Sequence, residues 1–345
     1  MLTRDHAWVG TLHEHAIDSQ ALTGNPLGDP NVRPLYVYTP PAYEAEPQRR
    51  FPTLYVIQGL TGMVEMWRNR KPFQPTVLER VDALFADPAT RPAVVVYVDA
   101  FTALGGSQFL DSPATGRYHT YLCDEVVPWV DAHYRTLPGA AHRGIAGKSS
   151  GGYGAMVTPM LRPDLFGGLA THAGDALFEH CYWPDVRAAI RALRDVYDGD
   201  YNAFWTDFRA RPGRPKHTDD ALLNVWAMAA CYSADADGTV RLPWHPDGRI
   251  DHDVWNRWLA WDPVRMAAVH GEALRSLRAI WIDAGRSDEF YLDVGADAFA
   301  AAVRGLGIGE PTLHVERFDG THANLEWRYP LALAFLSERL SAGTS

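Results

Sequence analysis

The stretch that decides the fold is RGIAGKSSGGYGAM, residues Arg143–Met156. It opens with a short apolar run typical of a buried strand and continues into a segment with helical character. Between the two, GKSSG fits the pattern G-x-S-x-G with Ser149 at its centre. The surrounding glycines lack a Cβ, so they leave room for a sharp turn that lifts the serine hydroxyl to the end of the strand. A Gly/Ser loop that caps a helix is the alternative.

Strands and helices alternate on both sides of this stretch. Short apolar or β-branched runs predict strands that are buried on both faces, and amphipathic runs between them predict helices. The predicted strands begin near Pro34, Pro52, Ala93, Arg143, Gly168, Ala279 and Leu313. Because strands that alternate with helices pair mainly in parallel, we expect an α/β fold with a mostly parallel, doubly wound sheet.

The alternation stops between residues 176 and 262. This segment contains aromatic-rich amphipathic helical runs, and a small hairpin is predicted across residues 238–250. We interpret it as a helical, cap-like insertion within a single domain that comprises residues 1–345. Its tryptophans either form an aromatic wall over Ser149 or attach the insertion to the core. They are Trp183, Trp205, Trp226, Trp244, Trp255, Trp258 and Trp261.

Composition excludes several classes of protein. The chain has 345 residues, 47% of them hydrophobic, which is enough for a large core. A net charge of −10 with scattered Lys and Arg argues against binding to nucleic acid or an anionic membrane. The first residues lack the apolar core of a secretory signal and no apolar run reaches membrane-spanning length, so we expect a soluble cytoplasmic protein. Homo-oligomer formation stays open.

A nucleophilic serine needs a histidine base and a carboxylate that orients it, in the chain order Ser, Asp or Glu, His. Asp288 in IDAGRSDEF follows the predicted strand from Ala279, and His322 in FDGTHANLEW follows the last predicted strand. Both therefore belong at the same edge of the sheet as Ser149. Ser149, Asp288 and His322 are the predicted catalytic residues.

Acyl chemistry also needs hydrogen-bond donors for the developing oxyanion. One predicted donor is the backbone N–H of Ser150, which follows the nucleophile. The other is the backbone N–H of Leu60 in the loop QGLTG, residues 58–62, where glycines allow close approach of a substrate. An ordinary glycine turn is the alternative for that loop.

Other polar residues have simpler interpretations. Asp283 and Glu289 are the substitutes if Asp288 is not the orienting carboxylate. His172 and His314 lie in predicted strands, so we expect them to be packed or hydrogen-bonded. Lys148, beside the nucleophile, is expected to form an ion pair.

Metal binding is not expected. His13 and His15 have a spacing that can bind a metal, but no partner ligand is evident, so an exposed pair is preferred. The segment DADG, residues 235–238, lacks the other ligands of a calcium loop and predicts a turn. Three cysteines without a C-x-x-C pair predict buried free thiols. The loop of residues 101–118 either lines the substrate pocket or is purely structural.

The ordered motifs resemble those of the esterase D, or enterochelin esterase-like, branch of the α/β-hydrolases. The matching segments are VIQGLTG, GGSQFLDSPATGRY, IAGKSSGGYGAM, IDAGRSDEF and GTHANLEW. The resemblance implies the α/β-hydrolase fold, the triad Ser149, Asp288 and His322, and an oxyanion hole formed by Leu60 and Ser150. Gly62 stands where the formylglutathione hydrolases of this branch usually have Cys, which argues against their substrate.

The sequence thus predicts a serine carboxylesterase that acts on a small-molecule ester through an acyl-enzyme intermediate, with an aromatic or short acyl group. No cofactor or metal is expected. An acyltransferase with the same triad is one alternative. A non-catalytic binding protein that keeps the α/β-hydrolase fold is an alternative of another class.

Overall fold

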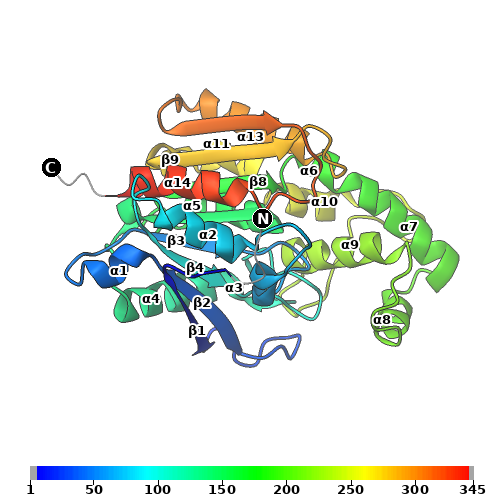
Figure 1. The fold of residues 1–345 in the computed structure, drawn as a ribbon. Helices are drawn as coiled ribbons and strands as arrows, with labels where there is room; N and C mark the ends of the chain where they lie inside the picture. Colours follow the sequence, from blue (N-terminus) through cyan, green and yellow to red (C-terminus); the bar gives the residue numbers. More distant parts are fainter. Residues whose placement is uncertain (1–5, 342–345) are drawn as a thin grey trace.

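The computed structural model of the chain describes residues 6–341, and its centre is an eight-stranded sheet with strand order β1-β2-β4-β3-β7-β8-β9-β10 (Figure 1). The pairs β1–β2 and β2–β4 are antiparallel, and all other neighbours are parallel. The predicted α/β class with a mostly parallel sheet is confirmed. The strands are β1 Thr11–Asp18, β2 Val32–Thr39, β3 Thr53–Ile57, β4 Val94–Val98, β7 Arg143–Ser149, β8 Gly168–Gly174, β9 Ala279–Gly285 and β10 Leu313–Phe318, with β5 Asp111–Ser112 and β6 Gly116–Arg117 in a separate ribbon.

Helices cover both faces of the sheet. Helices α2 and α14 pack on one face, and α5, α11 and α13 lie on the other (Figure 1). The helices are α1 Pro41–Ala45, α2 Val77–Ala86, α3 Tyr118–Thr120, α4 Val127–His133, α5 Ser150–Leu161, α6 Phe178–Cys181, α7 Trp183–Tyr197, α8 Tyr201–Arg209, α9 Asp219–Tyr232, α10 His252–Leu259, α11 Pro263–Val269, α12 Gly271–Arg275, α13 Leu292–Gly305 and α14 Arg328–Leu340. A π-helix, Tyr121–Val126, precedes α4, and short 3₁₀ helices span Val64–Arg68 and Ala140–His142.

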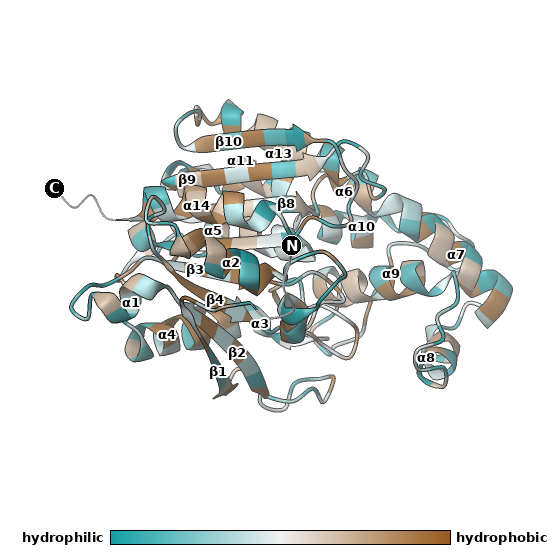
Figure 2. Ribbon diagram, in the orientation of Figure 1, coloured by the Kyte–Doolittle hydropathy of each residue, from teal (hydrophilic) through white to brown (hydrophobic). Residues whose placement is uncertain are grey.

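Successive residues of the central strands enter opposite cores. Ile145 on β7 and Leu169 on β8 belong to one hydrophobic cluster, whereas their neighbours Ala146 and Ala170 belong to the other. This two-residue period explains why the strands read as continuous apolar runs, since both faces are covered. In Figure 2 the central strands are coloured mainly as hydrophobic, and the outer helices carry hydrophilic stretches.

In the order of the chain, helices α6 to α12 come between β8 and β9. Helices α7 and α8 extend away from the sheet (Figure 1). The predicted helices of this segment are present, but the single hairpin predicted across residues 238–250 is wrong. Two separate turns occur there, closed by the isolated bridges Ala234–Val240 and Trp244–Ile250. Pro243 lies between them, and its missing N–H prevents a continuous ladder.

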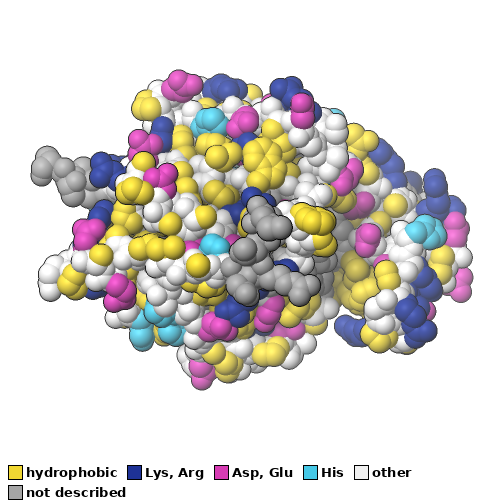
Figure 3. Space-filling model, in the orientation of Figure 1, with side chains coloured by type: hydrophobic (Ala, Val, Ile, Leu, Met, Phe, Trp, Pro, Cys, Tyr) yellow, Lys and Arg dark blue, Asp and Glu magenta, His cyan; other side chains and the backbone are white. Residues whose placement is uncertain are grey.

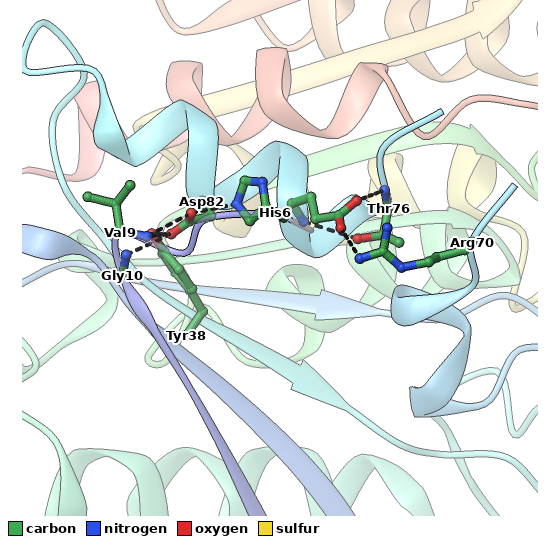
Figure 4. A network of polar contacts seen from close by, with 8 residues as sticks. His6, Val9, Gly10, Tyr38, Arg70, Thr76 and Asp82 are labelled. Carbon is green, nitrogen blue, oxygen red and sulfur yellow. Dashed lines mark hydrogen bonds and ion pairs between the residues drawn. The ribbon is translucent and has the colours of Figure 1, made fainter. Parts of the chain in front are cut away.

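A buried carboxylate on α2 holds residues 6–10 (Figure 4). Asp82 accepts hydrogen bonds from the backbone N–H groups of Val9 and Gly10 and from the hydroxyl of Tyr38. His6 Nε2 lies 2.7 Å from the same carboxylate. These contacts satisfy a charge that would be costly to bury alone.

Candidate active site

The site forms at the carboxyl ends of β3 and β7. The chain places β4 on one side of β3 and β7 on the other, so the strand order reverses there. At such a reversal the loops after the two strands diverge and leave a crevice, where ligands bind in open α/β sheets.

Ser149 occupies a strained turn between β7 and α5. Its backbone φ is 58° and its ψ is −129°, which non-glycine residues rarely adopt. A Cβ on Gly147 would lie 2.3 Å from the carbonyl oxygen of Gly151, and one on Gly151 would lie 2.5 Å from that of Ile57. Steric exclusion therefore explains both glycines of the motif, as the sequence predicted.

Asp288 and His322 come together from the loops after β9 and β10. His322 Nδ1 lies 2.9 Å from Asp288 Oδ2, and Asp288 is buried. The other oxygen, Asp288 Oδ1, accepts a 2.9 Å hydrogen bond from the N–H of Phe290. With Nδ1–H donating to the carboxylate, the imidazole presents Nε2 as its free acceptor.

A cavity of about 630 Å³ joins Ser149 and His322, because both side chains contribute to its wall. Aromatic and aliphatic side chains make up much of the remaining wall. The apolar members are Leu60, Met66, Trp67, Val77, Cys181, Tyr182, Leu223, Phe290, Leu292, Leu325 and Tyr329.

The two predicted oxyanion donors lie on the same cavity. Leu60 and Ser150 both line it. A Cβ on Gly59 would lie 3.4 Å from Ser149 Cβ, so the loop of residues 58–62 packs directly against the turn at Ser149. Ser150 is the first residue of α5, and the first N–H groups of a helix have no acceptor within the helix. Its N–H is thus available for an oxygen atom in the cavity.

The alternative carboxylates occupy other positions. Asp283 lies within β9, fully buried, and accepts hydrogen bonds from His172, Trp281 and Arg328 rather than from His322. Glu289 accepts a 2.9 Å hydrogen bond from the backbone N–H of His322, not from its ring.

Lys148 differs from expectation. It lines the cavity, and among residues 6–341 no carboxylate lies within ion-pair distance of its ammonium group. Burial lowers the pKa of Lys148, while the charges of Glu326 and Asp288 act in the opposite direction. Glu326 is paired instead with Lys71 at 2.7 Å. The predicted ion pair is therefore wrong, because the short strand-to-helix turn directs Lys148 into the cavity.

The insertion contributes to the cavity wall, but its tryptophans do not. Within the described chain, none of the seven tryptophans of residues 176–262 belongs to the wall. Trp258 is fully buried and packs against Tyr182 and Tyr232, with ring centroids 5.6 and 5.5 Å apart. These tryptophans attach the insertion to the core, which was the simpler of the two interpretations.

Sequence reasoning missed Asp175, which follows β8 directly. Asp175 Oδ2 accepts hydrogen bonds from Ser150 Oγ at 3.1 Å, Tyr182 Oη at 2.9 Å and Gln108 Nε2 at 3.2 Å. Burial raises its pKa, and the hydrogen bonds act against that rise. The sequence feature that could have identified Asp175 is its position directly after a predicted strand, at the same edge of the sheet as Ser149. Gln108 supports the wall from the loop of residues 101–118, of which no residue lines the cavity.

The remaining motifs contribute nothing to this cavity. His13 Nε2 contacts Thr39 and His15 Nε2 contacts Tyr134, and no group of three or more potential metal ligands occurs among residues 6–341. Asp235 forms a turn and pairs with Arg241 and Arg257. The cysteines are free and buried: Cys123, Cys181 and Cys231.

The surface shows no large region of one charge on the face of Figure 3, where acidic and basic described side chains are interspersed. Across residues 6–341, no helix combines the length and apolar character needed to cross a membrane.

Known structures share this architecture. A ferulic acid esterase superposes with a TM-score of 0.60 at 17% identity, over 97% of this chain and all of that one. An S-formylglutathione hydrolase from Agrobacterium tumefaciens gives a TM-score of 0.58 at 17% identity over 99% of each chain. The fold is thus that of the α/β-hydrolases.

The family follows from the sequence match. A family model described as "Putative esterase" matches residues 30–336, so the chain belongs to that esterase family. A curated relative, an endo-1,4-beta-xylanase/feruloyl esterase from Xylanibacter ruminicola, is 28% identical over 152 residues, or 44% of this chain. The match spans only 20% of that relative's length. The prediction from sequence is confirmed at the level of fold and family.

Proposed function

We propose that the protein is a serine carboxylesterase. The observation that carries the proposal is that Ser149 and His322 line one cavity while Asp288 holds the far side of the imidazole. In the forward step, Ser149 Oγ attacks the ester carbonyl carbon and His322 Nε2 accepts the hydroxyl proton. The proton then passes to the departing alkoxide, and an acyl-serine remains.

Water completes the cycle. His322 accepts a proton from the water molecule that attacks the acyl-serine, and returns it to Ser149 Oγ as the acid departs. Asp288 stabilises the imidazolium formed in each half, and the N–H groups of Leu60 and Ser150 stabilise each oxyanion. We assign residues 176–262 the role of a cap, because α6, α7 and α9 supply part of the cavity wall.

Substrate class is proposed from the cavity wall and the relatives. The aromatic side chains Trp67, Tyr182, Phe290 and Tyr329 suit an aromatic acyl or alcohol group, and several structural neighbours are named ferulic acid esterases. A short acyl group also fits a cavity of about 630 Å³.

The test is Ser149→Ala, assayed with p-nitrophenyl acetate and with a fluorophosphonate probe. We expect loss of labelling and a fall in kcat of at least about 10⁴-fold. Ser276→Ala, which changes an exposed serine away from the cavity, is the control. Labelling or turnover retained by the Ser149 variant would overturn the proposal, and faster transfer to an added alcohol than to water would indicate an acyltransferase.

A further inference from the structure

The cavity has an acidic side that hydrolysis of a simple ester does not require. Asp175, Asp185 and Asp220 all contribute to its wall. Asp185 lies in the first turn of α7 and Asp220 in the first turn of α9, so both come from the helical insertion. Their side chains form no ion pair with Lys or Arg within residues 6–341.

Asp175 is the most deeply buried of the three and is only partly satisfied. Its exposed fraction is 6%, and all three side-chain hydrogen bonds that it accepts go to Oδ2. Oδ1 receives no hydrogen bond from residues 6–341, and the side chain lines the cavity beside Ser150. Because Asp175 lines the cavity, the donor for Oδ1 comes from water or from a ligand that fills the cavity.

Asp185 and Asp220 line the same cavity and carry like charges. The negative charge of Asp220 adds to burial in raising the pKa of Asp185, and only the amide of Asn224, at 2.6 Å from Asp185 Oδ2, opposes the rise. Each helix N-terminus favours one carboxylate, and a bound cation would further reduce the repulsion between the two like charges.

Lys148 is the one lysine or arginine among the described residues that line the cavity. The carboxylates with the largest electrostatic effect on the pKa of Lys148 are those of Glu326, Asp288 and Glu289, from the loops that carry His322 and Asp288. Glu326 itself is paired with Lys71, which does not line the cavity. No ion pair to Lys or Arg is therefore formed by the carboxylates of Asp175, Asp185 and Asp220 among residues 6–341.

We propose, on the basis of the esterase function above, that the substrate carries an ammonium cation, which Asp175, Asp185 and Asp220 bind on the insertion side of the cavity. A bound cation neutralises carboxylates that would otherwise oppose the oxyanion at Ser149, so it favours the transition state as well as binding. The aromatic wall supports the same class, because ring faces attract ammonium groups.

The test compares each cationic ester with its uncharged isostere. On the alcohol side the pair is acetylcholine and 3,3-dimethylbutyl acetate. On the acyl side it is p-nitrophenyl 4-(trimethylammonio)butanoate and p-nitrophenyl 5,5-dimethylhexanoate. For at least one pair, we expect the kcat/KM ratio of cationic to neutral ester to fall about tenfold in Asp185→Asn and in Asp220→Asn. The ratio cancels any general loss of activity and the intrinsic reactivity of the esters.

Asp195→Asn is the matched control, since Asp195 lies on the same helix, α7, but is exposed and outside the cavity wall. Its ratio should equal that of the wild type. Asp175→Asn tests the most deeply buried carboxylate. If the Asp175 variant does not fold, Asp220→Asn still tests the inference. Ratios unchanged in the Asp185 and Asp220 variants for both pairs would overturn the inference. A different result would contradict the proposed esterase function: turnover of the neutral esters by the Ser149→Ala variant.

Discussion

At the scale of the residue, the turn around Ser149 depends on two glycines, Gly147 and Gly151, which have no side chain. Gly147 and Gly151 allow the backbone to close around Ser149, and a methyl group at either would overlap a carbonyl oxygen. The strain at Ser149, with φ of 58°, is thus maintained by packing on both sides of the turn.

Gly151→Ala should therefore destabilise the protein. The added Cβ would meet the backbone oxygens of Ile57 and Gln58 at 2.5 and 2.7 Å, and backbone cannot move aside cheaply. We expect a loss of about 1–3 kcal/mol in the free energy of unfolding, measured by urea denaturation. Gly305→Ala in α13, where nothing lies within 4 Å, is the control and should be neutral or slightly stabilising. Equal stability of the two variants would contradict the steric explanation.

Substitutions of Asp288 and Glu289, the two neighbouring carboxylates in the loop after β9, should differ in their effect on kcat. Asp288→Asn keeps the shape but favours the wrong imidazole tautomer, so we expect kcat to fall by about 10⁴-fold. Glu289→Gln changes only an acceptor for the backbone N–H of His322 and should lower kcat far less. Steady-state kinetics with p-nitrophenyl acetate measures both. A larger effect at Glu289 would move the orienting role to that residue.

At the scale of the element, one buried carboxylate joins β8, β9 and α14. Asp283 on β9 lies 2.7 Å from His172 Nδ1 on β8 and 2.8 Å from Arg328 Nε at the start of α14. The loops of Asp288 and His322 leave β9 and β10 close to this contact. Burial opposes ionisation of Asp283, but His172 and Arg328 outweigh it and hold its pKa below the ordinary value.

This contact should make stability depend on pH. Because the folded-state pKa of Asp283 is lowered, its contribution is present above the unfolded-state pKa of about 4 and is lost as the pH falls through the folded-state value. Asp283→Asn should cost about 3–5 kcal/mol at neutral pH, since it leaves Arg328 partly unpaired. Its free energy of unfolding should also decline less on acidification than that of the wild type. Parallel urea titrations of the two proteins check this, and identical acid profiles would refute it.

At the scale of the whole molecule, the insertion and the sheet share one hydrophobic core. Phe178 of α6 and Tyr232 of α9 belong to the same buried cluster as Ile145 and Leu169 of the sheet. Tyr153 of α5 touches both aromatic residues, with ring centroids 6.1 and 5.6 Å away. The insertion is therefore packed into the same core as the strands.

We expect α9 and the central strands to unfold together. Native-state hydrogen exchange should give amides of α9 and of β8 similar opening free energies, because separating them exposes the shared core. Amides of α8, which extends away from the sheet, should exchange by smaller openings and serve as the internal comparison. Much faster exchange in α9 than in β8 would instead indicate a separately moving lid.

Local patterns predicted much of the fold and several residues of the candidate site. Two-sided burial made β3, β4, β7 and β8 continuous apolar runs, and the glycines around Ser149 marked the turn. The antiparallel pairing of β1 and β2 was not predicted, since strand direction depends on the path of the chain and not on side-chain periodicity.

The sequence by itself determined the alternation of strands and helices, the turn at Ser149 and the chain order of Ser149, Asp288 and His322. Each of these can be recognised from hydrophobic periodicity or from a motif of a few residues. Only the tertiary structure decided that the tryptophans of the insertion pack against the core and that Asp175, Asp185 and Asp220 line the same cavity as Ser149. The physical reason is that proximity between distant segments comes from the packing of helices on the sheet, which no local pattern encodes.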